Sequence, residues 1–183
     1  MPSARGRSGF LNWLEQSRLV PVEVLTAMRK RAMPGELDRV AARARSLREW
    51  FRAFVREHKG RPLEAADLGE LETLNLLLAR DEGFGRIVAQ AHAGGAVLNF
   101  ERSRRWTSPE SLLLPIGEIL ATLLCQENFS YVKACEGPTC TLIFADHTRG
   151  HARRWCSMSA CGNRAKQTAY RNRAKRNVPV DPA

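Results

Sequence analysis

The sequence predicts a mainly α-helical N-terminal domain with one small β-hairpin, followed by a small cysteine-rich module, an α+β fold overall. Three observations carry this prediction. Apolar residues recur every three or four positions over several long segments, two β-prone runs flank a glycine-rich turn, and four of the five cysteines lie between residues 135 and 161. We expect the helical domain to span residues 1–130, the cysteine-rich module residues 131–178, and a short tail residues 179–183.

The sequence of residues 8–33 predicts a short apolar segment followed by one short helix. Residues 10–14 are mostly apolar. Pro21 suits the first turn of a helix, because proline has no amide hydrogen to leave unpaired and its φ angle is already helical. We expect this helix to carry Val22, Leu25 and Met28 and to end before Pro34-Gly35.

Residues 36–59 give the clearest helical pattern, with arginines and carboxylates mixed on the face opposite an apolar stripe. We expect His58 to lie in the capping region of this helix. A second helix is predicted to begin with Asp67 as its N-cap and to end at Gly83 and Gly85. The stripe that we expect to face the core contains Leu37, Val40, Ala41, Ala44, Leu47, Phe51, Phe54 and Val55.

Two short strands are predicted at residues 86–91 and 96–101. The turn between them, His92-Ala93-Gly94-Gly95, is rich in the residue that tolerates positive φ. The alternation of side chains along these strands leaves open which face is buried.

The last helix of the domain is predicted to start at Ser108-Pro109-Glu110, with a capping serine and a proline in the first turn. Pro115 should either kink this helix or mark its true beginning. Cys125, near its end, is expected to be a buried small hydrophobic residue. The apolar face that we expect to be buried contains Leu112, Leu113, Ile116, Ile119, Leu120, Leu123 and Leu124.

Four cysteines form two pairs, Cys135 with Cys140 and Cys156 with Cys161, and four residues separate the members of each pair. A structural zinc ion takes four soft ligands in a closed tetrahedron, and each pair can offer two thiolates from a tight loop. Disulfides are the alternative. No apolar run at the N-terminus resembles a signal peptide, so we expect a reducing, cytoplasmic location and one structural zinc ion.

The linker between the two cysteine pairs could form a short hairpin. It contains His147 and His151, either of which could in principle replace a cysteine as a zinc ligand. We expect both histidines instead to be exposed linker residues.

The residues around the cysteine pairs carry a family resemblance. Cys135-x4-Cys140 is followed by Leu142-Ile143-Phe144-x-Asp146 and then by Arg153-Arg154-Trp155-Cys156-Ser157-Met158-x-x-Cys161-Gly162-Asn163-Arg164-Ala165-Lys166. This pattern resembles the CGNR zinc finger at the C-terminus of bacterial proteins whose N-terminal domain is called ABATE, a family described as stress-induced transcription regulators. The resemblance implies a zinc-dependent module that binds nucleic acid.

The order of loop, β-prone run and helix predicts a treble-clef-like zinc finger. Its helix should run from Gly162 to about Lys175. Trp155 and Phe144 are expected to pack around the metal, because so small a module has little else to bury. A small-residue face of the helix can lie against the hairpin; it comprises Ala165, Ala169 and Asn172.

Positive charge is concentrated at the C-terminus. The formal net charge is +10. Residues 1–148 hold 20 Lys+Arg against 18 Asp+Glu, a net of +2, and residues 149–183 hold 9 against 1, a net of +8. This imbalance favours an anionic polymer as partner over a merely solvated surface. The candidate nucleic-acid-binding residues are Arg149, Arg153, Arg154, Asn163, Arg164, Lys166, Arg171, Arg173, Lys175 and Arg176. For Arg164 the alternative is a hydrogen bond to the carbonyls of a zinc loop.

Three functions are compatible with these features. The first is a transcription regulator that binds duplex DNA through the finger, as a possible homodimer and with an unidentified effector. The second is an RNA-binding or translation-linked protein, and the third is a structural module that binds a protein partner. We expect no enzymatic activity, because the sequence has no phosphate-binding glycine loop, nucleophile elbow or paired carboxylates. We also expect no membrane span, because no apolar run is long enough.

Overall fold

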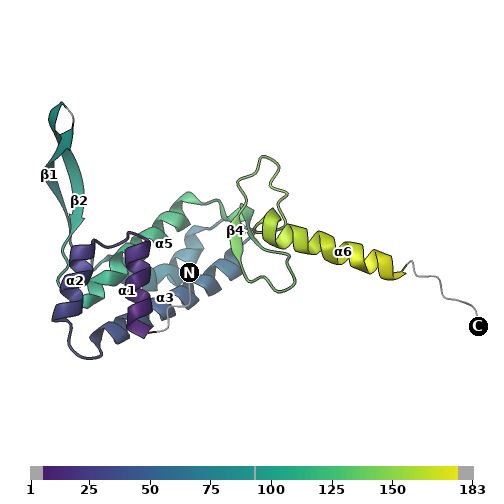
Figure 1. Ribbon diagram of the computed structural model, residues 1–183, viewed down its shortest axis with the longest axis horizontal. Coiled ribbons are helices and arrows are strands. Elements are labelled where there is room, and N and C mark those ends of the chain that lie inside the picture. The colour runs from purple at the N-terminus through teal and green to yellow at the C-terminus, as the bar shows by residue number, and fades with distance from the viewer. Residues whose placement is uncertain (1–5, 93, 177–183) are drawn as a thin grey trace, which may run out of the picture. The chain divides into compact units, whose positions relative to one another are not determined.

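The structure is a computed structural model, and it describes residues 6–92 and 94–176. The chain divides into two compact units. The helical unit comprises Met1–Phe51 and Ala66–Cys125, and the finger unit comprises Arg52–Ala65 and Gln126–Ala183. The division falls inside the longest helix of the described residues, α3 (Glu36–His58) (Figure 1).

The helical unit is built from helices of moderate length. The apolar entry segment is itself helical, because Phe10, Leu11 and Leu14 recur at helical spacing and are buried together. Helices α2 (Val22–Arg31) and α3 start near the predicted positions. The elements are α1 (Gly6–Gln16), α2, the first part of α3, the 3₁₀ helices η1 (Ala65–Leu71) and η2 (Pro109–Leu113), α4 (Glu72–Leu78) and α5 (Leu114–Gln126).

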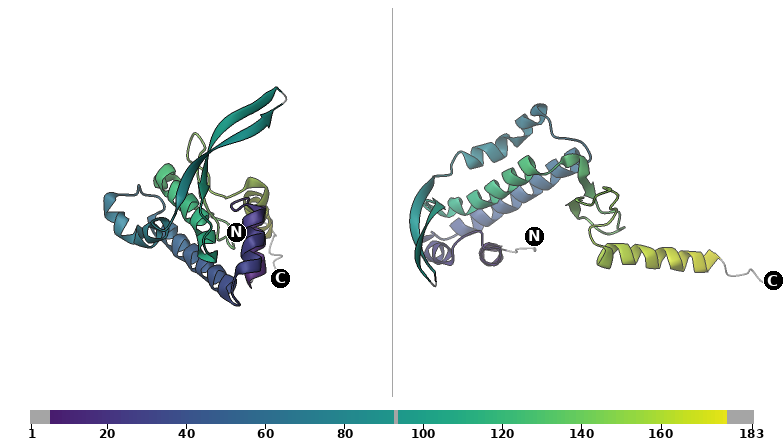
Figure 2. Two further views of the ribbon diagram at one scale, coloured as in Figure 1. Left: turned by 90° about the vertical axis from the view of Figure 1, so that its left-hand side faces the viewer. Right: turned by 90° about the horizontal axis from the view of Figure 1, so that it is seen from above.

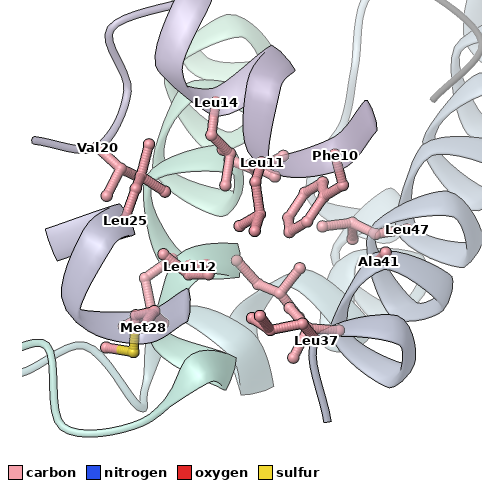
Figure 3. Packing of buried hydrophobic residues seen from close by; sticks show 14 of the residues in the cluster. Phe10, Leu11, Leu14, Val20, Leu25, Met28, Leu37, Ala41, Leu47 and Leu112 are labelled. Atoms are coloured by element: carbon pink, nitrogen blue, oxygen red, sulfur yellow. The ribbon is translucent and has the colours of Figure 1, made fainter. Parts of the chain in front are cut away.

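The core of the helical unit lies between α1, α2, α3 and the start of α5. Figure 3 shows Phe10 and Leu11 of α1 facing the α3 residues of the core. The predicted stripe of α3 is confirmed, because Leu37, Val40, Ala41 and Leu47 belong to this core. The other buried members of the core are Leu14, Val20, Leu25, Met28, Leu77, Leu112, Leu113, Leu114 and Ile116.

Two predicted helix starts are wrong in detail. Asp67 lies inside η1 and is buried, so α4 begins after Leu71 rather than after Asp67. The hydroxyl of Ser108 caps no helix; instead the Ser108 carbonyl accepts hydrogen bonds from the backbone N–H and the hydroxyl of Ser111. Pro115 lies in the first turn of α5 and so marks the beginning of that helix.

The expectation that α5 is buried on its whole apolar face is also wrong. Ile119 and Leu123 are 47% and 37% exposed, and the Cys125 side chain is exposed rather than buried. Their neighbours are covered: Leu120, next to Ile119, packs against the core, and Leu124, between Leu123 and Cys125, is buried. Periodicity identified an apolar face, but the covered part of α5 is narrower than that face.

The hairpin is longer than predicted. Strand β1 (Gly83–His92) pairs antiparallel with β2 (Gly95–Arg104) in unbroken register from Gly83↔Arg104 to His92↔Gly95. Gly83 and Gly85 therefore lie in a strand and do not end the preceding helix. At its base, Arg104 donates hydrogen bonds to Asp81 (2.6 Å) and Glu118 (2.8 Å). From that base the ribbon extends away from the helices of its unit (Figure 2).

The finger unit includes the last turns of α3. Phe129 packs edge-on against Phe54 at 6.4 Å, and Phe54 stacks on His58 at 4.0 Å between ring centroids. The backbone N–H of Gly60 donates to the Phe129 carbonyl at 2.9 Å. The other elements of the unit are η3 (Phe129–Tyr131), β3 (Val132–Ala134), β4 (Ile143–Ala145), the π-helical turn η4 (Met158–Gly162) and α6 (Asn163–Arg176).

Among the described residues, no helix has both the length and the apolar character needed to cross a membrane.

Candidate metal centre

The first cysteine pair lies on a loop between two short strands. Strands β3 and β4 pair antiparallel from Val132↔Ala145 to Ala134↔Ile143, and the Cys135 amide continues the ladder by donating to the Leu142 carbonyl at 2.9 Å. A turn closes the loop where the Cys140 amide donates to the Gly137 carbonyl. The hairpin of the finger therefore surrounds the first pair, and the expectation that the linker between the pairs forms the hairpin is wrong.

The second pair lies at the start of α6, as predicted. Cys156 precedes the turn η4, and Cys161 lies within it. The amides of Cys161 and Gly162 both donate to the Ser157 carbonyl at 3.0 Å, and the Ser157 hydroxyl accepts a hydrogen bond from the Ala160 amide. These bonds satisfy amides at the helix N-terminus and hold Cys161 toward the first loop.

The four sulfur atoms are placed as zinc requires. The ligand atoms of Cys135, Cys140, Cys156 and Cys161 all lie within 4.8 Å of one another. Cys140 Sγ is 3.7 Å from Cys156 Sγ, which is 3.8 Å from Cys161 Sγ. A zinc–sulfur bond of about 2.3 Å gives a tetrahedron with edges of about 3.8 Å. The cysteines are free thiols, not disulfides, and together they form a site for one zinc ion.

Hydrogen bonds to sulfur favour the thiolate of Cys135. The backbone amides of Cys156 and Gly137 each donate to Cys135 Sγ at 3.4 Å, and these bonds lower the pKa of Cys135 to about 7. Hydrogen bonds with the sulfurs of Cys135, Cys140 and Cys156 raise the pKa of Cys161 to about 12. Four thiolates packed this closely repel one another, so the fully ionised set requires a cation, and a divalent zinc ion would supply it.

Two glycines near the zinc ligands leave no room for a side chain, and Gly137 lies where the two cysteine loops approach each other. A Cβ atom on Gly137 would lie 3.1 Å from Cys140 Cβ and 3.2 Å from Cys161 Sγ. A Cβ atom on Gly162 would lie 2.6 Å from the sulfur of Met158. Both glycines sit beside predicted ligands in the sequence, yet only the packing explains why a side chain is excluded there.

The linker between the pairs is organised by the buried carboxylate of Asp146, which the sequence analysis did not identify as a site residue. Asp146 accepts hydrogen bonds from Lys133 Nζ (2.8 Å), from the Thr148 hydroxyl and amide (2.6 and 3.1 Å), and from the Arg153 amide (2.9 Å). The bonds from Lys133 and Thr148 hold the pKa of Asp146 well below its usual range. The carboxylate thus fixes the course of the chain between Cys140 and Cys156.

Neither linker histidine belongs to the sulfur cluster. His147 is exposed, as expected, and its Nε2 lies 3.5 Å from Glu127 Oε2. His151 is half-buried, which corrects the expectation that it is exposed. Its ring stacks on Tyr131 with 3.5 Å between centroids, and its Nδ1 lies 2.7 Å from the Asp146 carbonyl. His151 therefore supports the linker and does not bind the metal.

Comparison with protein-family models agrees with this geometry. The "CGNR zinc finger" model matches residues 131–174, and the ABATE model, described as "Putative stress-induced transcription regulator", matches residues 5–127. The second match covers more than half of the chain. The chain belongs to the ABATE family. No curated protein matches the sequence.

Three of the predicted nucleic-acid-binding residues have structural roles in the CGNR finger. The Arg153 guanidinium lies 4.7 Å from the Phe144 ring centroid and donates to the carbonyls of Trp155 and Cys156. Arg154 pairs with Glu136 at 2.6 Å and lies 4.9 Å from the Trp155 ring. Asn163 donates from its amide to the Ser159 carbonyl at 3.4 Å.

The remaining predicted nucleic-acid-binding residues whose side chains the structure describes are exposed. Arg149 lies in the linker, and Arg164, Lys166, Arg171 and Arg173 lie along α6. Within the described residues, none of these five side chains makes a hydrogen bond or an ion pair, so the alternative role of Arg164 as a partner of the zinc loops is not observed. Lys175 and Arg176 are part of α6, but their side chains lie outside the described residues.

The expected packing of α6 against the hairpin is wrong. Ala169 and Asn172 are exposed, and Ala165 is half-buried. Figure 1 shows α6 leaving the finger at its N-terminal end and extending away from β4. Most of the helix surface is therefore open to solvent.

Proposed function

We propose that this ABATE protein is a transcription regulator whose CGNR finger binds duplex DNA through α6. The observation that carries the proposal is the set of exposed cations on α6, Arg164, Lys166, Arg171 and Arg173, which have no acidic partner among the described residues. No acidic residue occurs in the sequence between Asp146 and Asp181. A surface of this kind binds phosphates and releases their counterions.

The zinc site supports the proposal because it holds the first residues of α6. Cys161 is a zinc ligand in η4, and α6 begins two residues later at Asn163. The four cations form two pairs, Arg164 with Arg171 and Lys166 with Arg173. The members of each pair are seven residues apart, which is a rise of about 10 Å along the helix. Removing zinc would release the N-terminal end of this array, so DNA binding should depend on zinc.

The test is a salt-dependent titration of the zinc-loaded protein against duplex DNA. The logarithm of the binding constant falls linearly with the logarithm of the salt concentration, and each phosphate contact steepens this slope by about 0.9 in B-DNA. The variant Arg164→Gln, Lys166→Gln, Arg171→Gln and Arg173→Gln should bind weakly and lose most of that slope. The matched control removes four exposed cations of the helical unit: Arg18→Gln, Lys30→Gln, Arg31→Gln and Arg39→Gln. It lowers the net charge equally and should bind like the wild type.

The same titration with RNA separates the proposal from its alternative. Arginine contacts to phosphate do not distinguish DNA from RNA. If the protein bound structured or single-stranded RNA more tightly than duplex DNA, the RNA-binding alternative would replace the proposed role in transcription. If the α6 variant and the control variant bound DNA with equal affinity, α6 would not be the binding surface. If the wild type bound neither DNA nor RNA, the remaining function would be recognition of a protein partner. We further propose that the protein acts by binding, without catalysis, in the cytoplasm.

A further inference from the structure

The β1–β2 ribbon has two unlike faces. One face is polar, with an ion pair between Arg86 and Glu101 at 3.4 Å and a hydrogen bond from Asn99 to Gln90 at 2.7 Å. The register places Ile87 opposite Phe100, Ala89 opposite Leu98 and Ala91 opposite Ala96 on the other face. We call these six residues the apolar hairpin face.

The apolar hairpin face is uncovered in the described part of the chain. Ile87, Leu98 and Phe100 are 72%, 71% and 72% exposed. An isolated two-stranded hairpin is at best marginally stable in water, and monomeric proteins seldom expose a large contiguous apolar patch. A regular ten-residue pairing with this face in water therefore indicates a surface that another surface covers.

We propose that the apolar hairpin face is a self-association surface, on which the ribbon of a second copy of this chain packs face to face. Charge supports a second copy as the occupant. The whole chain carries +10, yet residues 84–101 contain one arginine and one glutamate, which pair on the opposite face. Arg102 lies beyond Phe100 at the base end of the same face. Two copies packed over these six residues therefore bring few like charges together, in contrast to the basic finger.

Shape also supports self-packing. On the apolar hairpin face, the bulky residues are Ile87, Leu98 and Phe100, and the small ones are Ala89, Ala91 and Ala96. The Phe100 ring lies over Gly85, where a Cβ atom would come within 2.4 Å of it. The face thus carries its bulky side chains toward the base of the hairpin and its alanines toward the tip. A twofold axis perpendicular to the strands places the bulky end of each copy on the alanine end of the other, the alternation of large and small side chains that close packing requires.

The available area is sufficient for a dimer. Side chains of this size, exposed by about 70%, allow each copy to bury on the order of 500 Å² of apolar surface. Two copies together bury on the order of 1,000 Å², which reaches the lower end of specific interfaces. A dimer would also place two CGNR fingers on one nucleic acid and raise the affinity of each weak site. The self-association itself does not depend on nucleic-acid binding.

The experiment is sedimentation velocity of the zinc-loaded full-length protein across the micromolar range, without nucleic acid. The test variant is Ile87→Thr with Leu98→Thr, which leaves Phe100 over Gly85 and keeps residues suited to strands. The matched control, Val88→Thr with Val97→Thr, makes the same kind of change on the opposite face of the ribbon. Circular dichroism and hydrogen exchange of the ribbon amides establish that both variants are folded.

We expect a reversible dimer for the wild type and the control, and a dissociation constant raised by roughly tenfold or more in the test variant. A wild-type protein that stays monomeric at the highest concentration would overturn the proposal and leave a different protein as the occupant. A test variant that dimerises as tightly as the wild type would also overturn it. Neither result bears on DNA binding, which the titration with the α6 variant tests separately.

Discussion

Lys133 donates a 2.8 Å hydrogen bond to the buried carboxylate of Asp146. Lys133 lies in β3, before the first cysteine pair, and Asp146 follows β4 at the start of the linker to the second pair. Lys133 Nζ also donates to the carbonyl of His151 farther along that linker. One lysine and one carboxylate thus connect the strands that flank the first two zinc ligands with the segment that leads to the third.

Replacing Asp146 should weaken zinc binding although Asp146 is not a ligand. In Asp146→Asn, the side chain keeps its shape but loses its charge and cannot accept every hydrogen bond from Lys133, Thr148 and Arg153. Substitutions of residues that position ligands typically reduce metal affinity about 10- to 100-fold. Competition with a chromogenic chelator measures the change. The control is Glu136→Gln, which removes an exposed ion pair and should change zinc affinity little. Equal affinities in the two variants would contradict the role of Asp146.

The pH dependence of this stabilisation follows from the depressed pKa of Asp146. A carboxyl group with a lowered folded-state pKa stabilises the fold above its unfolded pKa of about 3.9, and loses that contribution as pH falls through the folded value. With zinc in saturating excess for both proteins, the difference in thermal stability between the wild type and Asp146→Asn should therefore be constant from about pH 5 to about pH 8. Differential scanning fluorimetry of both proteins measures it. A difference that varies across this neutral range would mean that another group is responsible.

The two finger glycines should differ in their tolerance of a methyl group. In Gly137→Ala the new Cβ would meet Cys140 Cβ and Cys161 Sγ, atoms that the zinc ion holds in place. In Gly162→Ala it would meet the end of the Met158 side chain, which is 50% exposed and can move away. We expect zinc affinity to fall by roughly tenfold in Gly137→Ala and less in Gly162→Ala.

Gly150→Ala is the control for both glycine variants, because no atom lies within 4 Å of its Cβ position. It should bind zinc like the wild type in the same chelator competition. If Gly162→Ala lost more affinity than Gly137→Ala, the close approach of the two cysteine loops would not be the controlling contact.

The zinc ligands and the main helices could be predicted from sequence because each depends on local spacing. Two cysteine pairs specify a tetrahedral site, and the stripe of α3 specifies a buried face. Asp146 could not be identified in this way, because its partners Lys133 and Arg153 approach it only after β3 and β4 have paired. Cys125 was misjudged for a related reason, since apolar neighbours do not reveal which side of a helix is covered: Leu124 beside it is buried, whereas Cys125 is exposed.

Loss of one zinc ligand should unfold the finger while the helical core persists. In Cys156→Ser, a hydroxyl replaces a thiolate in the four-sulfur site, and zinc affinity should fall by more than about 100-fold, beyond the usual effect of residues that only position ligands. Zinc content and hydrogen exchange then measure the outcome. Amides of β3, β4 and η4 should lose protection, whereas those around Leu14 and Leu25 should keep it, because that core contains no zinc ligand.

Cys125→Ser is the matched control for the ligand variant. Cys125 is exposed and lies outside the sulfur cluster, so this variant should retain one zinc ion per chain and a protected finger. Treating the wild type with a strong chelator should reproduce the exchange pattern of Cys156→Ser, since in both cases the four thiolates lose the ion that allows them to pack together. Full zinc content and normal protection in Cys156→Ser would show that the ligand set is assigned wrongly.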